Sequence, residues 1–177
     1  MSEPLAIRTA TPDDAPALLA IYAPSVAETA TSFEETVPGV DEFAARIARA
    51  QTRWRWLVAE RGGECAGYAY GSAHRERAAY RWSVEVSAYV HPRHRRGGVA
   101  RALYTRLFAE LAELGHCSAY AGITLPNDAS VGLHRALGFE PVGVFRAVGW
   151  KFGRWHDVAW FQRRLRDTPP GPEPRRG

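Results

Sequence analysis

A short glycine turn rich in arginine, at residues 95–100, is the place in this chain where residue types and spacing most clearly indicate chemistry. It reads Arg-Arg-Gly-Gly-Val-Ala and joins a strand-like run, 84–90, to an amphipathic helical run. Glycines permit a tight turn and leave amide N–H groups accessible to an anion. The start of the helix adds unpaired N–H donors at the positive end of its dipole. The turn therefore favours a phosphate or pyrophosphate site, with an ordinary surface loop as the alternative.

Acid–base chemistry is indicated by Glu85, a carboxylate within the same apolar strand-like run. Partial burial in such a strand raises the pKa of a carboxyl group, which suits a general base that acts near neutral pH. The structural alternative is an outward-facing carboxylate paired with a neighbouring arginine. Two arginines, Arg75 and Arg77, precede this strand in a polar connection. Their guanidinium groups can clamp a carboxylate or phosphinate bidentately, although arginines are also typical of a solvated surface.

The elements that must position these residues mix strands and helices. We expect strands at residues 5–9, 56–60, 65–72, 82–91, 118–124, 142–151 and 158–165, and helices from Thr11 to about Ala27, from an Asp41 cap onward, over Val99–Leu114, and from Asn127 towards Gly138. The Gly62-Gly63 pair predicts a hairpin, and Pro12 suits the first turn of a helix. In the second helix we expect Phe43, Ile47 and Ala48 to share the buried face. The order predicts an α/β (α+β) fold with helices on the faces of one mixed sheet.

Length and composition restrict the class of protein. A chain of 177 residues suits one domain, placed at residues 1–166, followed by a proline-rich, disordered tail at 167–177. No apolar run approaches the roughly 18–20 residues of a membrane helix. The two cysteines, Cys65 and Cys117, match no metal spacing and fit a reducing cytosol, with both thiols buried. We therefore expect a cytoplasmic protein without a metal. The net charge of +4 and the basic run 93–96 leave a nucleic-acid-binding module as an alternative. That run lacks the interleaved aromatics of single-strand binders.

The turn Arg95-x-x-Gly98-x-Ala100, in this order of elements, resembles the coenzyme A pyrophosphate turn of the GNAT superfamily of acetyl-CoA-dependent N-acetyltransferases. The likeness narrows to the subgroup that acetylates phosphinothricin, methionine sulfone and methionine sulfoximine. It covers residues 5–165 and is carried by the segments Glu85-Val86-Ser87-Ala88-Tyr89-Val90, Leu125-Pro126-Asn127-Asp128, Ala136-Leu137-Gly138-Phe139 and Gly153-Arg154-Trp155-His156-Asp157-Val158. The resemblance implies a single, mostly antiparallel sheet of about seven strands flanked by four helices.

The resemblance also implies which residues contact acetyl-CoA. The strand Ala88-Tyr89-Val90 would offer backbone groups to the pantetheine arm where it splays from its neighbour. Asn127 is implied as a further contact, with a helix cap as its structural role. His134 would lie beside the acetyl-CoA, either assisting Glu85 or contacting the cofactor, whereas a lone histidine on a helix can also be structural. The pyrophosphate would bind at Arg95, Arg96, Gly97, Gly98, Val99 and Ala100.

The implied reaction is direct acetyl transfer to the α-amino group of a small amino acid or analogue, with Glu85 as general base. A covalent cysteine route lacks an activated thiol. The acceptor would lie against Phe33, Arg75, Arg77, Tyr80 and Ser87. Alternatives within the fold are acetylation of protein N-termini or of a polyamine, although a polyamine site would need carboxylates rather than arginines. Related enzymes are commonly homodimers, and we expect a homodimer here.

Overall fold

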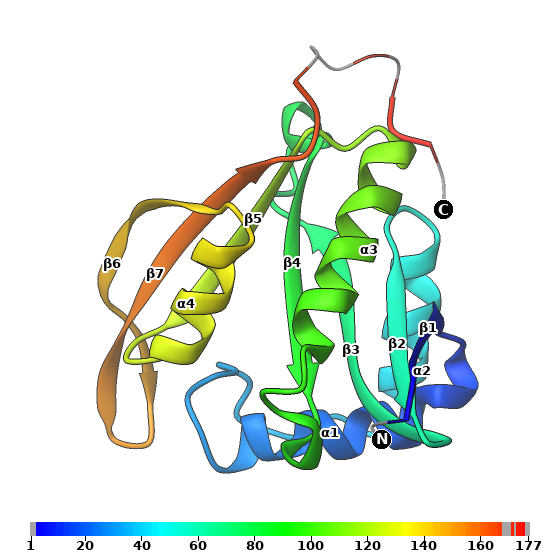
Figure 1. Cartoon of the computed structure of the whole chain (residues 1–177). Helices are drawn as coiled ribbons and strands as arrows, with labels where there is room; N and C mark the ends of the chain where they lie inside the picture. Colours follow the sequence, from blue (N-terminus) through cyan, green and yellow to red (C-terminus); the bar gives the residue numbers. More distant parts are fainter. Residues whose placement is uncertain (1–2, 168–170, 172, 176–177) are drawn as a thin grey trace.

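The computed structural model describes residues 3–167, 171 and 173–175 and contains a seven-stranded sheet in the order β1-β2-β3-β4-β5-β7-β6 (Figure 1). The strands are β1 (Leu5–Thr9), β2 (Trp56–Arg61), β3 (Glu64–Ala73), β4 (Ser83–Val90), β5 (Ser118–Thr124), β6 (Glu140–Lys151) and β7 (Arg154–Arg164). Every neighbouring pair is antiparallel except β4 and β5, which run parallel. The mixed, mostly antiparallel sheet expected from the sequence is therefore confirmed.

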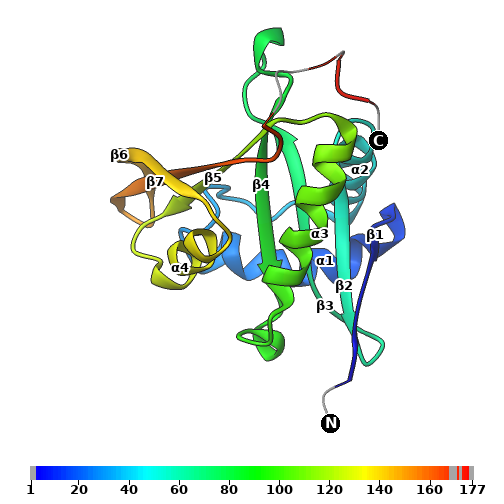
Figure 2. The same ribbon diagram turned by 45° about the horizontal axis from the view of Figure 1, so that its top comes forward.

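Four α-helices cover the two faces of this sheet. They are α1 (Ala15–Ala27), α2 (Val40–Gln51), α3 (Val99–Leu114) and α4 (Asp128–Ala136). The first two lie behind the sheet and the last two in front of it, as Figures 1 and 2 show. Each face consequently has its own apolar core, one beneath α3 and α4 and one beneath α1 and α2.

Local signals explain where several elements begin and turn. The backbone N–H of Thr11 donates to Asp14 Oδ2 at 2.7 Å, which closes a capping box at a short 3-10 helix, Pro12–Asp14, before α1. Asn127 Oδ1 accepts from the Ser130 N–H at 3.1 Å and caps α4. The Gly62-Gly63 turn joins β2 to β3 in the expected hairpin.

Three local expectations need correction. Helix α2 begins at Val40 with Gly39 as its N-cap, so Asp41 lies inside the first turn rather than capping it. Its buried face is formed by Phe43, Ile47 and Ala50, while Ala48 is exposed. Residues three or four positions apart share a helix face, whereas Ala48 follows Phe43 by five positions and therefore points away from it. Cys117 is buried as expected for a structural thiol, whereas Cys65 is only partly buried.

The last two strands both begin earlier than expected, and the turn between them explains the early start of β7. β7 begins at Arg154, four residues before the predicted start, and β6 begins at Glu140. Phe152 and Gly153 both have positive φ, at 52° and 71°, as a two-residue hairpin turn requires. That tight turn allows pairing to continue up to Lys151 and Arg154.

The C-terminal tail is only partly described. Residues 168–170, 172 and 176–177 lie outside the described residues, so a disordered tail stays a prediction for them. The Arg175 N–H donates to Leu114 O at 2.8 Å, at the end of α3. Among the described residues, none of the helices combines the length and apolar character needed to cross a membrane.

Candidate active site

The parallel strands β4 and β5 separate halfway along their length. They pair only at Ser83–Glu85 against Ser118–Tyr120, whereas β3 follows β4 as far as Val90. Beyond Glu85, the β4 backbone groups that face β5 therefore have no strand to pair with. The polar groups of β4 beyond Glu85 are therefore available to a ligand. The family resemblance implied that β4 splays from its neighbour in this stretch.

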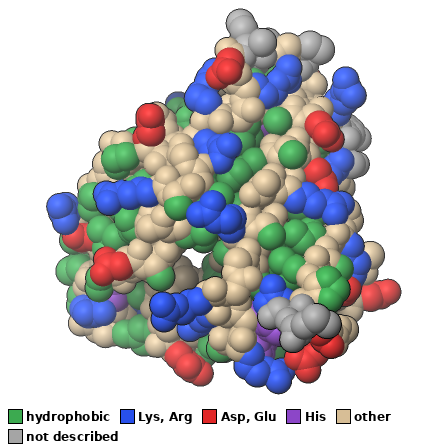
Figure 3. All heavy atoms as spheres, viewed as in Figure 1, with side chains coloured by type: hydrophobic (Ala, Val, Ile, Leu, Met, Phe, Trp, Pro, Cys, Tyr) green, Lys and Arg blue, Asp and Glu red, His purple; other side chains and the backbone are tan. Residues whose placement is uncertain are grey.

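A cavity of about 70 Å³ occupies this separation. Its lining comes from both faces of the sheet, with Tyr104 and His134 from α3 and α4 and Thr31 from the loop between α1 and α2. The space-filling view shows the molecule hollowed through between α4 and β4 (Figure 3). The cavity thus connects the α3 and α4 face with the loop on the opposite face. Five predicted site residues line it directly, namely Ser87, Ala88, Tyr89, Asn127 and His134.

The glycine turn lies between β4 and α3. Arg96 and Gly98 have positive φ, at 61° and 77°, and Gly98 is the N-cap of α3. The first N–H groups of a helix have no acceptor within it, so those of Val99 and the next two residues are free to bind an anion. Gly97 lies against Arg61, whose guanidinium donates to the Gly97 carbonyl at 3.1 Å, and a Cβ there would lie 2.8 Å from that guanidinium.

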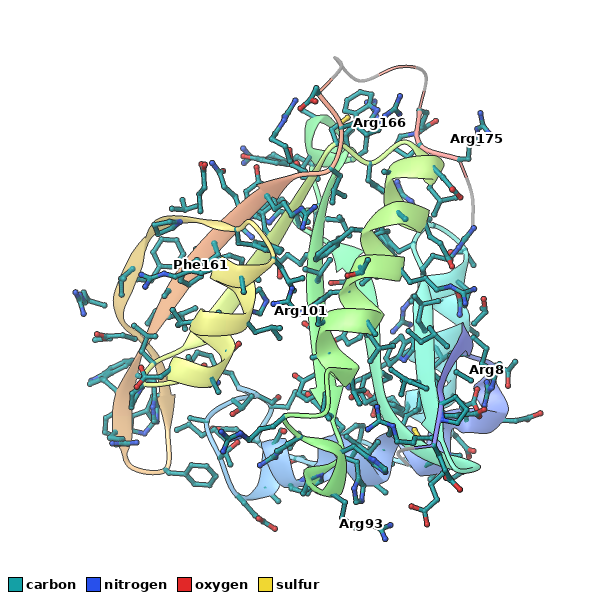
Figure 4. The ribbon with its side chains drawn as sticks, in the orientation of Figure 1. Arg8, Arg93, Arg101, Phe161, Arg166 and Arg175 are labelled. Atoms are coloured by element: carbon teal, nitrogen blue, oxygen red, sulfur yellow. The ribbon has the colours of Figure 1, made fainter. Side chains whose placement is uncertain are left out.

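The basic run beside this turn is exposed. Figure 4 shows Arg93 at the lower end of the molecule, beyond the sheet. It forms an ion pair with Glu64 at 3.1 Å, while Arg95 and Arg96 are open to solvent. The cations nearest the free N–H groups of α3 are thus accessible to a phosphate group.

His134 is a buried residue whose ring has one fixed hydrogen bond. Its Nδ1 lies 2.7 Å from the Ser130 carbonyl oxygen, an acceptor, so Nδ1 carries the proton. Burial lowers the pKa of His134 and keeps the ring neutral. Nε2 is then an acceptor, and it is buried without a hydrogen-bond partner among the described residues. Because His134 lines the cavity between β4 and β5, this atom is suited to a donor on a ligand.

Glu85 is half-buried and has two cationic or polar neighbours. Its Oε1 lies 3.1 Å from His74 Nδ1 and 3.2 Å from an Arg75 guanidinium nitrogen. Burial raises the pKa of Glu85, while the bonds and charges of His74 and Arg75 oppose the rise. The structure therefore combines both expectations for this residue, partial burial and pairing with an arginine.

Three residues near Glu85, namely His74, Tyr120 and Trp160, were missed by the sequence analysis. His74 stacks on Tyr120, with ring centroids 4.2 Å apart, and meets the edge of Trp160 at 6.1 Å. The Arg75 guanidinium lies over the same Trp160 ring at 5.7 Å. A signal for His74 was present in the chain, since it follows β3 directly and a β3–β4 hairpin brings that position back beside the start of β4.

Only some of the residues predicted to bind the acceptor lie close to Glu85. Arg75 contacts Glu85, and Tyr80 meets the ring of His74 at 5.8 Å. Ser87 lies on β4 two residues after Glu85 and therefore on the same face. Arg77 is exposed at the start of a short 3-10 helix, Ala78–Tyr80.

Phe33 belongs to the loop between α1 and α2, and the β6–β7 hairpin positions it. The ring packs so closely on Gly149 that a Cβ at that position would overlap it. Lys151, the single lysine of the chain, is buried and donates to the carbonyls of Val26, Thr29 and Ser32 at 2.7–2.9 Å. Its own carbonyl lies 2.9 Å from His156 Nε2. The hairpin thus holds the loop that carries Phe33.

Asp157, in the Trp-His-Asp-Val segment, shapes the same hairpin. Its carboxylate accepts from the Ala147 N–H and from Arg146, both at 2.8 Å. Ala147 has a φ of 48° at a break in the β6–β7 register. The Trp-His-Asp-Val segment, one of those that carry the resemblance to the subgroup, therefore has a structural task in this chain.

No cluster of three or more potential metal ligands is found within residues 3–167 or the described part of the tail.

The comparisons with known proteins agree over almost the whole chain. The acetyltransferase (GNAT) domain family matches residues 7–160. A phosphinothricin N-acetyltransferase of Streptomyces viridochromogenes is 40% identical over 171 residues, covering 97% of this chain and 93% of that protein. An L-methionine sulfoximine/L-methionine sulfone acetyltransferase of Salmonella typhimurium is 37% identical over 162 residues, covering 91% and 95%.

A solved structure is also similar. The phosphinothricin acetyltransferase of Sinorhizobium meliloti, in complex with acetyl-CoA, superposes with a TM-score of 0.90 at 38% identity. The match covers 97% of this chain and 95% of that one.

Proposed function

Because this chain belongs to the acetyltransferase (GNAT) family, we propose that it transfers the acetyl group of acetyl-CoA to the α-amino group of a small amino acid or analogue, of the phosphinothricin and methionine sulfone class. Membership of the family confirms the resemblance and the enzyme class expected from the sequence. The observation that carries the proposal is the cavity at the separation of β4 and β5, with Glu85 at the point where the strands part.

The residues around this cavity fit acetyl-CoA. From Val86 to Val90, the β4 backbone groups that face β5 have no strand partner and suit the amides of a pantetheine arm, which can add to a strand edge. The free N–H groups at the start of α3, with exposed Arg95 and Arg96 beside them, suit a pyrophosphate. The unpartnered Nε2 of His134 suits a donor on the same ligand. Bound acetyl-CoA supplies the activated acetyl group.

Glu85 is proposed to act as the general base in a direct transfer. It accepts a proton from the substrate ammonium group, so that the neutral amine attacks the thioester carbonyl. The new N–C bond forms and the C–S bond breaks, with its electron pair going to sulfur. The nitrogen then gives up a second proton, which passes to the leaving thiolate, so that the products are the amide and the free thiol. The raised pKa of Glu85 supports this role, because a carboxylate of higher pKa is a better proton acceptor.

His134 is proposed to contact the cofactor rather than to assist Glu85. Its neutral ring presents an acceptor atom to the cavity and packs against Tyr104 and Phe139, at ring distances of 5.4 and 5.1 Å. Neither thiol supports a covalent route, because Cys117 is buried and burial raises the pKa of Cys65, the reverse of activation.

The acceptor is proposed to bind on the α1 and α2 face, where Arg75 contacts Glu85 and Tyr80 packs against His74, with Phe33 proposed as a further wall. An arginine-lined site suits the carboxylate of an amino acid. A polyamine, which is cationic, would meet like charge there. Exposed Arg77 is proposed as a second anchor for the acceptor.

A thiol-release assay tests this function. Purified protein and acetyl-CoA are combined with phosphinothricin, methionine sulfone, methionine sulfoximine, aspartate and aromatic amino acids in turn. Turnover with at least one of the first three is expected. Release no faster than the acceptor-free background with every compound, together with acetylation of a peptide N-terminus, would reverse the choice of acceptor.

A homodimer is proposed from the exposed apolar surface of the β6–β7 hairpin. Large apolar side chains are exposed there, namely Val142, Val144, Phe145, Val148, Trp150, Phe152 and Trp155. Figure 3 shows hydrophobic side chains along the left edge of the molecule, over these strands. A patch of this kind favours a protein interface, and a second copy would cover it on both subunits. Light scattering should give the mass of a dimer for the wild type. Trp150→Glu places a charge in the apolar patch and should give the mass of a monomer. A monomeric wild type would contradict the proposal.

A further inference from the structure

A second cavity, of about 220 Å³, lies between α2 and the strands β2 and β3. It is on the α1 and α2 face of the sheet, which is the face that carries Glu85. Its walls are largely aromatic: Trp56 and Tyr70 stack with ring centroids 4.2 Å apart at 13°, and Tyr68 stacks on Trp56 at 5.5 Å. Nothing in the proposed chemistry so far uses this space.

The cavity begins one strand away from Glu85. Ser72, which lines it, is the direct register partner of Glu85 in the β3–β4 ladder, and Tyr70 is the partner of Ser87. Directly opposed residues of antiparallel strands share a face, with Cβ atoms about 5 Å apart. An amino group placed at Glu85 would therefore leave the side chain of the same molecule within reach of the cavity.

Two buried polar atoms belong to its walls. Trp56 is 3% exposed and Tyr68 0%, and neither Trp56 Nε1 nor the Tyr68 hydroxyl has a hydrogen-bond partner among the described residues. A buried donor without an acceptor is costly, and each such group calls for an explanation. An oxygen atom on a bound ring would satisfy the indole N–H, and the Tyr68 hydroxyl could then donate or accept.

We propose that this cavity is the side-chain subsite of the acceptor, and that it takes an aromatic ring bearing a hydrogen-bond acceptor, as in tyrosine. The inference rests on the proposed function, since it places the α-amino group at Glu85. Arg46 and Arg49 also line the cavity, but Arg46 is already paired with Glu34 and Glu42. The stacked rings therefore favour a neutral aromatic side chain over a second anionic group, whose burial among them is far more costly than that of a phenol. Phosphinothricin would consequently keep its phosphinate at the arginines outside it.

The test fills the cavity from α2. Ala50 is 7% exposed and lines the cavity, so Ala50→Leu places three further carbons in it. Ala45→Leu, at an exposed position of the same helix, is the matched control. Acetylation of L-tyrosine, L-phenylalanine and phosphinothricin is measured with all three proteins, after circular dichroism has verified their folding.

The wild type should use tyrosine about threefold or more better than phenylalanine in kcat/KM. Ala50→Leu should raise the KM for tyrosine about tenfold, a typical effect of altered pocket size, and leave that for phosphinothricin within about twofold. Ala45→Leu should change neither value. Equal effects of Ala50→Leu on tyrosine and phosphinothricin would overturn the subsite, as would tyrosine that is neither acetylated nor a competitive inhibitor.

Calorimetric titration of L-tyrosine separates this inference from the proposed function. If no acceptor is acetylated, the proposed function fails, and binding still decides the subsite. Affinity about tenfold weaker in Ala50→Leu than in Ala45→Leu supports it. Equal affinity in the two variants, or no binding to the wild type, overturns it.

Discussion

His74 Nδ1 lies 3.1 Å from Glu85 Oε1, across the open end of the β3–β4 hairpin. The same histidine stacks on Tyr120 of β5, so the carboxylate is held by a residue that both neighbouring strands position. Arg75 approaches the same oxygen at 3.2 Å. The basicity of Glu85 therefore depends on a balance between burial and these two partners.

Glu85→Gln removes the proposed base and preserves the shape of the side chain. The rate should fall by about a hundredfold or more. The loss should be greatest below the pH at which the substrate amine deprotonates by itself, since a base is needed only there. The pH dependence of kcat/KM measures this, and a rate equal to that of the wild type at every pH would exclude Glu85 as the base.

Arg75→Ala should move the acidic limb of the kcat/KM profile to higher pH. The Arg75 cation favours the ionised form of Glu85 and so opposes the rise in its pKa. Its removal raises that pKa further, and the base form is then lost at a higher pH as the solution is acidified. Arg75→Lys retains the charge and should restore most of the original limb. A limb that moves to lower pH in Arg75→Ala would contradict this balance.

Arg77→Ala tests the second acceptor anchor. The change removes the guanidinium that is proposed to pair with the carboxylate of the amino acid, so the KM for the amino acid should rise by about tenfold. The side chain is exposed, so the fold and the KM for acetyl-CoA should be unchanged. Arg77→Lys keeps the charge but cannot form a bidentate pair, so its KM for the amino acid should lie between those of the wild type and Arg77→Ala. Steady-state kinetics with each substrate varied in turn separates these values. Equal increases in both KM values would indicate a structural role.

Lys151→Met should destabilise the fold. The buried ammonium donates to three carbonyls, and its removal leaves these acceptors without their donor, so its loss should lower the free energy of unfolding by about 2 kcal/mol or more. Urea denaturation measures this change. Arg154→Met, an exposed position of the same hairpin, is the control and should lie within about 0.5 kcal/mol of the wild type. Equal stability of Lys151→Met and the wild type would show that the loop does not depend on the contact.

The amino-acid sequence by itself determined the order of the elements, the hairpin at Gly62-Gly63, the caps at Thr11 and Asn127, and the glycine turn before α3. These features depend on residues a few positions apart, because caps, turns and amphipathic periods are local. Within α2 the local pattern did not decide the cap or the buried face, and the expectations that Asp41 caps the helix and that Ala48 is buried were wrong.

Only the tertiary structure decided which of these residues meet. The separation of β4 from β5 depends on which strands pair and for how long. The contact of His74 with Tyr120 and the bond from Lys151 to Ser32, 119 residues away, follow from the packing of whole elements. The cavity beside Trp56 likewise exists only because α2 lies over β2 and β3. Such contacts join distant segments through register and burial, which no local pattern in the chain encodes.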